Sequence, residues 1–144
     1  EDYSKKFGFS LLPRRNNRPT ACYFTEPIDL RGNDITTGVS ASDRYKLIKK
    51  MVEKDATFRD FEIPGHSFPL VARRNGVLER EGHTEAAVDL VKIAGYKSIA
   101  VTVEIIKNDG EMARLPELIE FAKLHSLHIG LIKDLIKYRK EQKF

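Results

Sequence analysis

The chain has 144 residues, of which 41% are hydrophobic and 32% are charged, and its formal net charge is +4 at pH 7. This predicts a single domain over residues 1–144 and excludes two ordinary domains, while the mild basic excess suits an anionic small molecule as well as nucleic acid. The lone cysteine, Cys22, excludes an internal disulfide, and the sequence has neither a membrane-length apolar run nor a signal peptide, so we expect a cytoplasmic protein without a membrane partner.

The first third of the chain predicts little regular structure. Residues 1–6 show neither a helix start nor a strand, and residues 7–20 form a polar loop bounded by proline. Residues 20–25 are typical of a short strand. A helix is expected from Ser40, because Asp43 follows three residues later as in a capping box.

The next segment, residues 54–75, has no sustained hydrophobic period. Two prolines and a glycine surround His66 in the sequence P-G-H-S-F-P, which predicts turns. After Glu85 the apolar residues recur at helical spacing until Gly95, so a helix is expected there. The apolar positions of that helix are Ala87, Val88, Leu90, Val91 and Ala94.

The last third of the chain predicts two strands and two helices. Residues 98–105 alternate between apolar and other residues, and 127–132 make a second short strand. Pro116 suits the first turn of a helix that follows a tight turn at 108–110, and residues 134–143 close the chain as a helix. Strands mixed with helices predict an α+β fold, a layered α/β sandwich with a mixed sheet.

The most informative segment is the cluster R-E-G-H-T-E, which directly precedes the helix after Glu85. Backbone N–H groups and the positive end of the helix dipole favour an anion at a helix N-terminus, and Arg80 and Thr84 would add donors for a phosphate. In the simpler alternative, Thr84 is only an N-cap and Arg80, Glu81 and Glu85 are solvated charges. A cap, however, needs neither His83 nor a glycine before it.

Two further residues are candidates for proton transfer. His66 carries an imidazole, the side chain most often used for proton transfer, and its flanking prolines restrict the backbone. Glu104 lies inside a predicted strand, on the face opposite four aliphatic side chains, where glutamate is uncommon unless that face is wet or functional. The simpler interpretation of each is an exposed surface residue.

Six ordered segments of the sequence together resemble the 3,4-dihydroxy-2-butanone 4-phosphate synthase family. They are T-T-G-V-S-A-S-D-R at 36–44, P-G-H-S-F-P-L at 64–70, G-V-L-E-R-E-G-H-T-E-A-A-V-D-L at 76–90, V-E at 103–104, N-D-G-E-M-A-R at 108–114 and D-L-I-K-Y-R at 134–139. The match runs from about residue 20 to the C-terminus with the family's spacing.

The resemblance implies a lyase of riboflavin biosynthesis that converts D-ribulose 5-phosphate into formate and L-3,4-dihydroxy-2-butanone 4-phosphate. It implies Mg²⁺ or Mn²⁺ as the cofactor and a homodimer with active sites at the interface. By position, Arg80, Glu81, Gly82, His83 and Thr84 resemble the substrate-binding segment, with His83 as a metal ligand. His66 and Glu104 resemble the catalytic pair, Glu104 also contacting substrate.

One part of the family pattern has no counterpart here: the N-terminal portion whose flexible acidic loop supplies a metal-binding glutamate, a substrate-binding arginine and an aspartate. We therefore expect the chain to be the C-terminal portion of the family domain. The alternatives are a non-catalytic phosphosugar-binding module and a catalytically incomplete fragment of the synthase. A nucleic-acid-binding protein is a further rival, resting only on the net charge and the lysine-rich C-terminal end.

Overall fold

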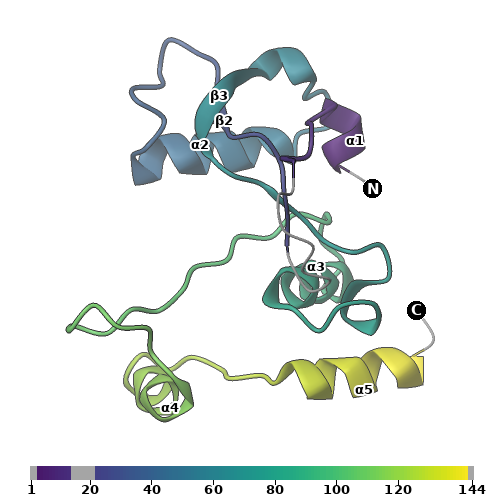
Figure 1. The fold of residues 1–144 in the computed structure, drawn as a ribbon, viewed down its shortest axis with the longest axis vertical. Helices are drawn as coiled ribbons and strands as arrows, with labels where there is room; N and C mark the ends of the chain where they lie inside the picture. Colours follow the sequence, from purple (N-terminus) through teal and green to yellow (C-terminus); the bar gives the residue numbers. More distant parts are fainter. Residues whose placement is uncertain (1–2, 14–21, 143–144) are drawn as a thin grey trace.

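The computed structural model describes residues 3–13 and 22–142, and these residues combine helices with small antiparallel sheets (Figure 1). The α-helices are α1 (Tyr3–Phe7), α2 (Ala41–Met51), α3 (His83–Ile93), α4 (Leu115–Leu124) and α5 (Ile132–Gln142). The strands are β1 (Tyr23–Phe24), β2 (Ile28–Leu30), β3 (Phe61–Ser67) and β4 (Leu70–Val71), and two 3₁₀ turns are η1 (Phe58–Asp60) and η2 (Gly76–Leu78).

The α+β class is confirmed, but the sheet is simpler than expected. Within the described residues β1 pairs with β4 and β2 pairs with β3, both antiparallel, so the pairings seen there do not form a mixed sheet. β3 was not predicted, because Pro64 and Gly65 interrupt any strand-like pattern. A bulge accommodates them: Ile28 pairs with Ser67, whereas the next residue, Asp29, pairs with Glu62.

The main hydrophobic core lies between α1, α2 and the β2–β3 pair, in the upper part of Figure 1. Phe7 packs edge-on against Phe61 with ring centroids 4.9 Å apart, and Phe9 lies 5.4 Å from the same ring. The prediction that residues 1–6 lack helix was therefore wrong for α1. Tyr3 and Phe7 are one helical turn apart and both buried, so tertiary packing supplies the stability that local propensity does not.

Helix α2 begins as predicted. Ser40 is its N-cap, and the Ser40 hydroxyl accepts a hydrogen bond from the amide of Asp43 at 3.0 Å. Leu47 and Met51 are buried on the face that contacts the core. The predicted strand at 20–25 is β1, which is shorter, and residues 20 and 21 lie outside the described part of the chain.

The helix predicted after Glu85 is α3, which begins slightly earlier, at His83, and ends just before Gly95, whose φ is +80°. Its buried face differs from the expectation, because the buried residues are Glu85, Ala86 and Asp89, while Leu90 is 55% exposed. Asp89 accepts a hydrogen bond from the amide of Val77 in η2 and pairs with Arg139 of α5 at 2.5 Å. This buried ion pair ties α5 beneath α3 (Figure 1).

Two predicted strands are absent from the described residues. Residues 98–105 are an extended, largely exposed segment in which Ile99 packs against the core while Val101 and Val103 are 62% and 84% exposed. A strand requires a neighbouring backbone to pair with, and no described strand lies alongside this segment. Residues 127–131 are likewise irregular, and helix α5 already begins at Ile132.

The remaining predictions for this region hold. The turn at 108–110 is present, closed by a bond from the Lys107 amide to the Glu111 carbonyl, and Pro116 lies in the first turn of α4. The end of α5 is described as far as Gln142, so Lys143 lies outside the described residues. Among residues 3–13 and 22–142, every helix falls short of the length and apolar character that a membrane crossing requires.

Candidate functional site

The predicted substrate segment lies at the N-terminus of α3. Gly82 is the N-cap and His83 the first helical residue, so the amides of the first turn point away from the helix towards any bound anion. Thr84 is the second helical residue and not the N-cap, so the simple capping interpretation was wrong. His83 and Glu81 are exposed.

Arg80 and Glu85 form the strongest contact of this segment. Arg80 Nη1 lies 2.5 Å from Glu85 Oε2, and the side chains are 19% and 2% exposed. Burial opposes the charge on Arg80, but the hydrogen bond and the charge of Glu85 outweigh it and raise the pKa of the guanidinium above its ordinary value. Glu85 is therefore a buried ion-pair partner and not a solvated charge.

Glu85 and Arg80 also reach other segments. Glu85 Oε1 accepts a hydrogen bond from the backbone amide of Arg73 at 3.0 Å. Arg80 Nη2 donates to Cys22 Sγ at 3.2 Å, and Cys22 Sγ lies 4.0 Å from the Thr84 hydroxyl. The helix N-terminus is thus held against the segment that follows β4 and against the residue that precedes β1.

His66 lies at the end of β3 beside an aspartate that the sequence did not single out. Its Nδ1 is 2.6 Å from Asp29 Oδ2, and its backbone amide donates to Asp29 Oδ1 at 3.1 Å. The Asp29 side chain is 12% exposed, whereas that of His66 is 56% exposed. The imidazole is therefore fixed at one edge and open at the other.

The turn that precedes α2 covers Asp29. Gly38 has φ +76°, and a Cβ on it would overlap the Asp29 carboxylate, so a residue without a side chain is required there. The turn is itself held by Asp43, which accepts hydrogen bonds from the Thr36 hydroxyl at 2.6 Å and the Gly38 amide at 3.2 Å. These bonds, the one from the Thr36 hydroxyl first, lower the pKa of Asp43 below its ordinary value.

Glu104 stands apart from these residues. It lies on the largely exposed 98–105 segment, and no described contact joins it to His66 or to the N-terminus of α3. In the described part of the chain, no group of three or more His, Cys, Asp or Glu side chains is arranged to hold a metal ion. His83 alone is not a sufficient site for Mg²⁺, which prefers several oxygen ligands.

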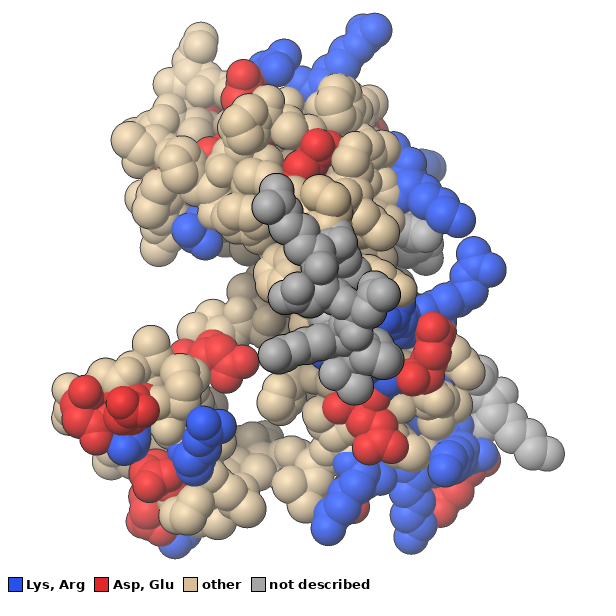
Figure 2. All heavy atoms as spheres, in the orientation of Figure 1, with Lys and Arg blue, Asp and Glu red and all other residues tan. Residues whose placement is uncertain are grey.

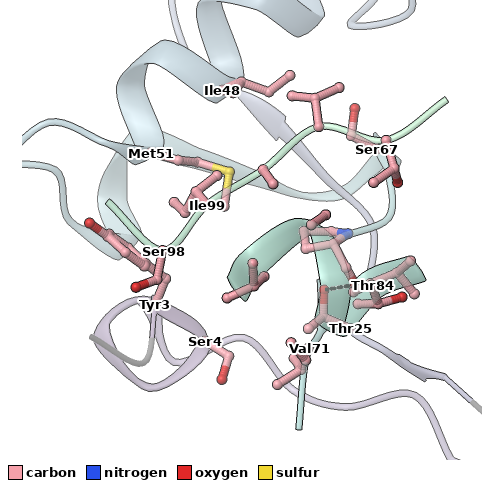
Figure 3. A pocket seen from close by; sticks show the side chains of 18 of the residues that line it. Tyr3, Ser4, Thr25, Ile48, Met51, Ser67, Val71, Thr84, Ser98 and Ile99 are labelled. Atoms are coloured by element: carbon pink, nitrogen blue, oxygen red, sulfur yellow. Dashed lines mark hydrogen bonds between the residues drawn. The ribbon is translucent and has the colours of Figure 1, made fainter. Parts of the chain in front are cut away.

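A large cavity lies next to the N-terminus of α3 (Figure 3). Its volume is about 1140 Å³, and it is lined by α2, α3, the residues after β3 and the 98–103 segment. Thr84, Ala87 and Val88 contribute the α3 wall, opposite Ile48 and Met51 of α2. Ala87 and Val88, two of the five apolar positions predicted on α3, therefore face this cavity, which explains why they are not fully buried.

Sequence reasoning missed three participants: Asp29, Arg73 and Cys22. Asp29 has no motif around it, and only the bulge between β2 and β3 brings it to His66. Arg73 stacks its guanidinium over the Tyr23 ring, 3.6 Å from the centroid, while its amide binds Glu85. The contacts of Asp29 and Arg73 are both consequences of pairing between segments that are distant in the sequence.

The surface charge shows no single-sign patch on the face drawn in Figure 2. Lysine and arginine side chains lie among aspartate and glutamate side chains over α3, α4 and α5, and the upper part carries fewer charges. An electrostatic footprint for nucleic acid would be a basic patch or stripe on one surface. This face therefore adds nothing to the nucleic-acid hypothesis.

Comparison with known proteins gives a consistent result. The family model for 3,4-dihydroxy-2-butanone 4-phosphate synthase matches residues 1–138. The riboflavin biosynthesis protein RibBA of Cytophaga hutchinsonii is 54% identical over 81% of this chain and 29% of its own length. The synthase of Photorhabdus laumondii subsp. laumondii is 42% identical over 99% of this chain and 66% of its own length.

Solved structures agree. A crystal structure of RibBX, a two-domain 3,4-dihydroxy-2-butanone 4-phosphate synthase from A. baumannii, superposes with a TM-score of 0.88 at 41% identity, covering 96% of this chain and 40% of that one. A synthase structure in complex with two magnesium ions has a TM-score of 0.85 at 28% identity, over 98% and 70%. The chain thus spans only part of each relative, and it belongs to the 3,4-dihydroxy-2-butanone 4-phosphate synthase family.

Proposed function

We propose that the protein carrying this chain converts D-ribulose 5-phosphate into L-3,4-dihydroxy-2-butanone 4-phosphate and formate. The observation that carries the proposal is the family match over residues 1–138, together with His66 and Glu104 at the positions that resemble the catalytic pair. The exposed edge of the His66 imidazole supports a role in proton transfer, because a proton donor or acceptor must reach the substrate.

The proposed phosphate site is the N-terminus of α3. The amides of the first turn and the helix dipole favour the phosphate dianion there. Arg80 lies two residues before the N-cap of α3, where its guanidinium donates hydrogen bonds to Glu85 and to Cys22. The Thr84 hydroxyl lines the adjoining cavity, which is the proposed place for the sugar chain.

The proposed chemistry needs two groups that exchange protons. The substrate must be enolised, dehydrated and rearranged before formate leaves, and each step moves a proton next to a carbonyl or hydroxyl. His66 offers an imidazole and Glu104 a carboxyl group, two proton-exchanging groups of different type, so one can act as a base while the other acts as an acid. Glu104 lies on the exposed 98–105 segment, and we infer that this segment packs into the site in the assembled enzyme.

A divalent cation, Mg²⁺ or Mn²⁺, is the proposed cofactor, and His83 is the proposed protein ligand. A bound cation would stabilise negative charge on the sugar oxygens. The donors among the described residues do not fit a complete site, because His83 has no carboxylate cluster around it. The oxygen ligands that complete the proposed site would therefore come from outside those residues.

We further propose a homodimer with the active sites at the subunit interface. The exposed apolar side chains of the 98–106 segment support it, since Val101, Val103 and Ile106 are each more than half exposed. Sedimentation of the full-length protein at micromolar and nanomolar concentrations tests this proposal. A species of monomer mass at all concentrations would contradict it.

The decisive experiment measures formate released from D-ribulose 5-phosphate by the full-length protein in the presence of Mg²⁺. We expect His66→Ala and Glu104→Ala each to lose activity at least ~100-fold, the usual contribution of a proton-transfer group. The matched controls are His128→Ala and Glu120→Ala, because both side chains are exposed and distant in sequence from the proposed site. Each control should keep the activity of the unmodified protein.

The outcomes separate the alternatives. Full activity in both His66→Ala and Glu104→Ala would overturn the assignment. Binding of ribulose 5-phosphate without turnover by the unmodified full-length protein would instead indicate a phosphosugar-binding module or a catalytically incomplete synthase.

A further inference from the structure

We propose that Asp29 is a positioning residue for His66, holding the neutral imidazole in the tautomer that leaves Nε2 free to accept a proton. The inference rests on the proposed function, in which His66 exchanges a proton with the substrate. The inference adds Asp29 to the proposed site, a residue around which the sequence shows no motif.

Asp29 holds His66 through two contacts, one to its side chain and one to its backbone. Asp29 Oδ2 is 2.6 Å from His66 Nδ1, and Asp29 Oδ1 accepts the His66 backbone amide at 3.1 Å. A carboxylate can only accept hydrogen bonds, so the ring nitrogen that faces it must carry a proton. In a neutral imidazole the other nitrogen, Nε2, then has the lone pair.

The fold brings Asp29 to this position by means of the bulge in β3. Because Ile28 pairs with Ser67 and Asp29 with Glu62, residues 63–66 leave the regular ladder at this point. Gly65 makes the close approach possible, since a Cβ there would overlap the backbone between Ile28 and Asp29. The amide of Gly65 bonds to the Pro27 carbonyl at 2.8 Å, which anchors the bulge.

A second segment closes over the carboxylate from the other side. The Gly38 turn lies against Asp29, and Asp43 holds that turn through three hydrogen bonds from Thr36 and Gly38. Asp29 is consequently 12% exposed while the imidazole it holds is 56% exposed. A shielded carboxylate behind an accessible imidazole is the arrangement that orients a general base, with the carboxylate fixing the ring.

The substitution Asp29→Asn tests the proposal with almost no change in shape. The amide oxygen can still accept the His66 backbone amide, which leaves the side-chain NH₂ facing Nδ1. That group donates, so Nδ1 must become the acceptor and the proton moves to Nε2. We expect kcat for formate release by the full-length protein to fall at least ~100-fold while KM changes little.

Two further measurements separate positioning from a general loss of structure. Long-range ¹H–¹⁵N correlation spectra of the imidazoles, assigned with His66→Ala, should show the proton of neutral His66 on Nδ1 in the unmodified protein and on Nε2 in Asp29→Asn. The control Glu62→Gln alters a carboxylate of the same strand pair that binds the exposed Arg31, and it should change neither kcat nor the His66 signals.

The outcomes distinguish this proposal from the proposed function. If His66→Ala is inactive and Asp29→Asn keeps full kcat, the positioning role is overturned while the proposed function stands. Neutral His66 with its proton on Nε2 in the unmodified protein would also overturn it, whatever the variant does. If His66→Ala keeps full activity, the proposed role of His66 fails. The double variant Asp29→Asn/His66→Ala should be no less active than His66→Ala alone, because both substitutions act through the His66 imidazole.

Discussion

The buried ion pair between Asp89 and Arg139 provides the sharpest test of how the C-terminal helix is held. Asp89 Oδ2 and Arg139 Nη1 are 2.5 Å apart, and the two side chains are 2% and 10% exposed. In Arg139→Met the guanidinium is lost and the carboxylate stays buried. The amide of Val77, 2.9 Å away, is the remaining donor described for it.

The size of the effect follows from this geometry. Removing one partner of a buried ion pair costs about 3–5 kcal/mol, because it leaves a charge without compensation in a poorly solvated place. The bond from Val77 persists and methionine retains much of the apolar stem, so we expect a loss at the lower end, about 3 kcal/mol. Urea unfolding followed by circular dichroism at neutral pH measures it.

Lys137→Met is the matched control on the same helix. Lys137 and Glu141 are 4.0 Å apart and their side chains are 78% and 60% exposed, so the change should cost less than about 0.5 kcal/mol. Adding Asp89→Asn to Arg139→Met removes the buried charge and should recover part of the loss. A loss below about 1 kcal/mol in Arg139→Met, or an equal loss in Lys137→Met, would refute the reasoning.

Three further predictions concern the site. Asp43→Asn should destabilise the protein at neutral pH. The pKa of Asp43 in the folded protein lies below its ordinary value of 3.8. The stability that the Asp43 carboxylate contributes is therefore present above about pH 4 and is lost as the pH falls through the folded pKa. Urea unfolding across the pH range should show the gap between the two proteins closing in acid, and a gap independent of pH would contradict this. Gly38→Ala should cost roughly 2 kcal/mol and lower kcat, since the new Cβ meets the Asp29 carboxylate at positive φ; unchanged thermal stability and activity would refute the close approach. Arg80→Met should cost about 3 kcal/mol and weaken binding of ribulose 5-phosphate, because Glu85 loses its buried partner. Calorimetric titration and urea unfolding check it against Arg31→Met, whose exposed pair with Glu62 should contribute below about 0.5 kcal/mol; equal effects in the two variants would contradict the prediction.

The elements that the sequence predicted well are those whose signals are local. Helix α2 is marked by its Ser40 cap, α3 by its stop at Gly95, and α4 by Pro116. Each signal acts within one helical turn, through side-chain capping or an allowed backbone angle. The location of the predicted substrate segment at a helix N-terminus followed from the same reasoning.

The predictions that were wrong depend on distant partners. Alternation at 98–105 is a strand pattern, yet the described chain offers it no neighbouring strand. Strand β3 forms in spite of Pro64 and Gly65, because a bulge opposite Asp29 accommodates them. Helix α1 lacks a local signal and depends on the packing of Phe7 against Phe61.

By itself, the sequence determined the family, the start of helix α2, the glycine stop after α3 and the residue types available for chemistry, since motifs and caps are properties of short segments. Only the tertiary structure decided that Asp29 contacts the His66 imidazole, that Arg80 pairs with a buried Glu85, and that Glu104 lies on an exposed segment away from both. These relations join residues far apart in the chain. Strand register, bulges and burial set them, and short-range sequence patterns carry no information about any of the three.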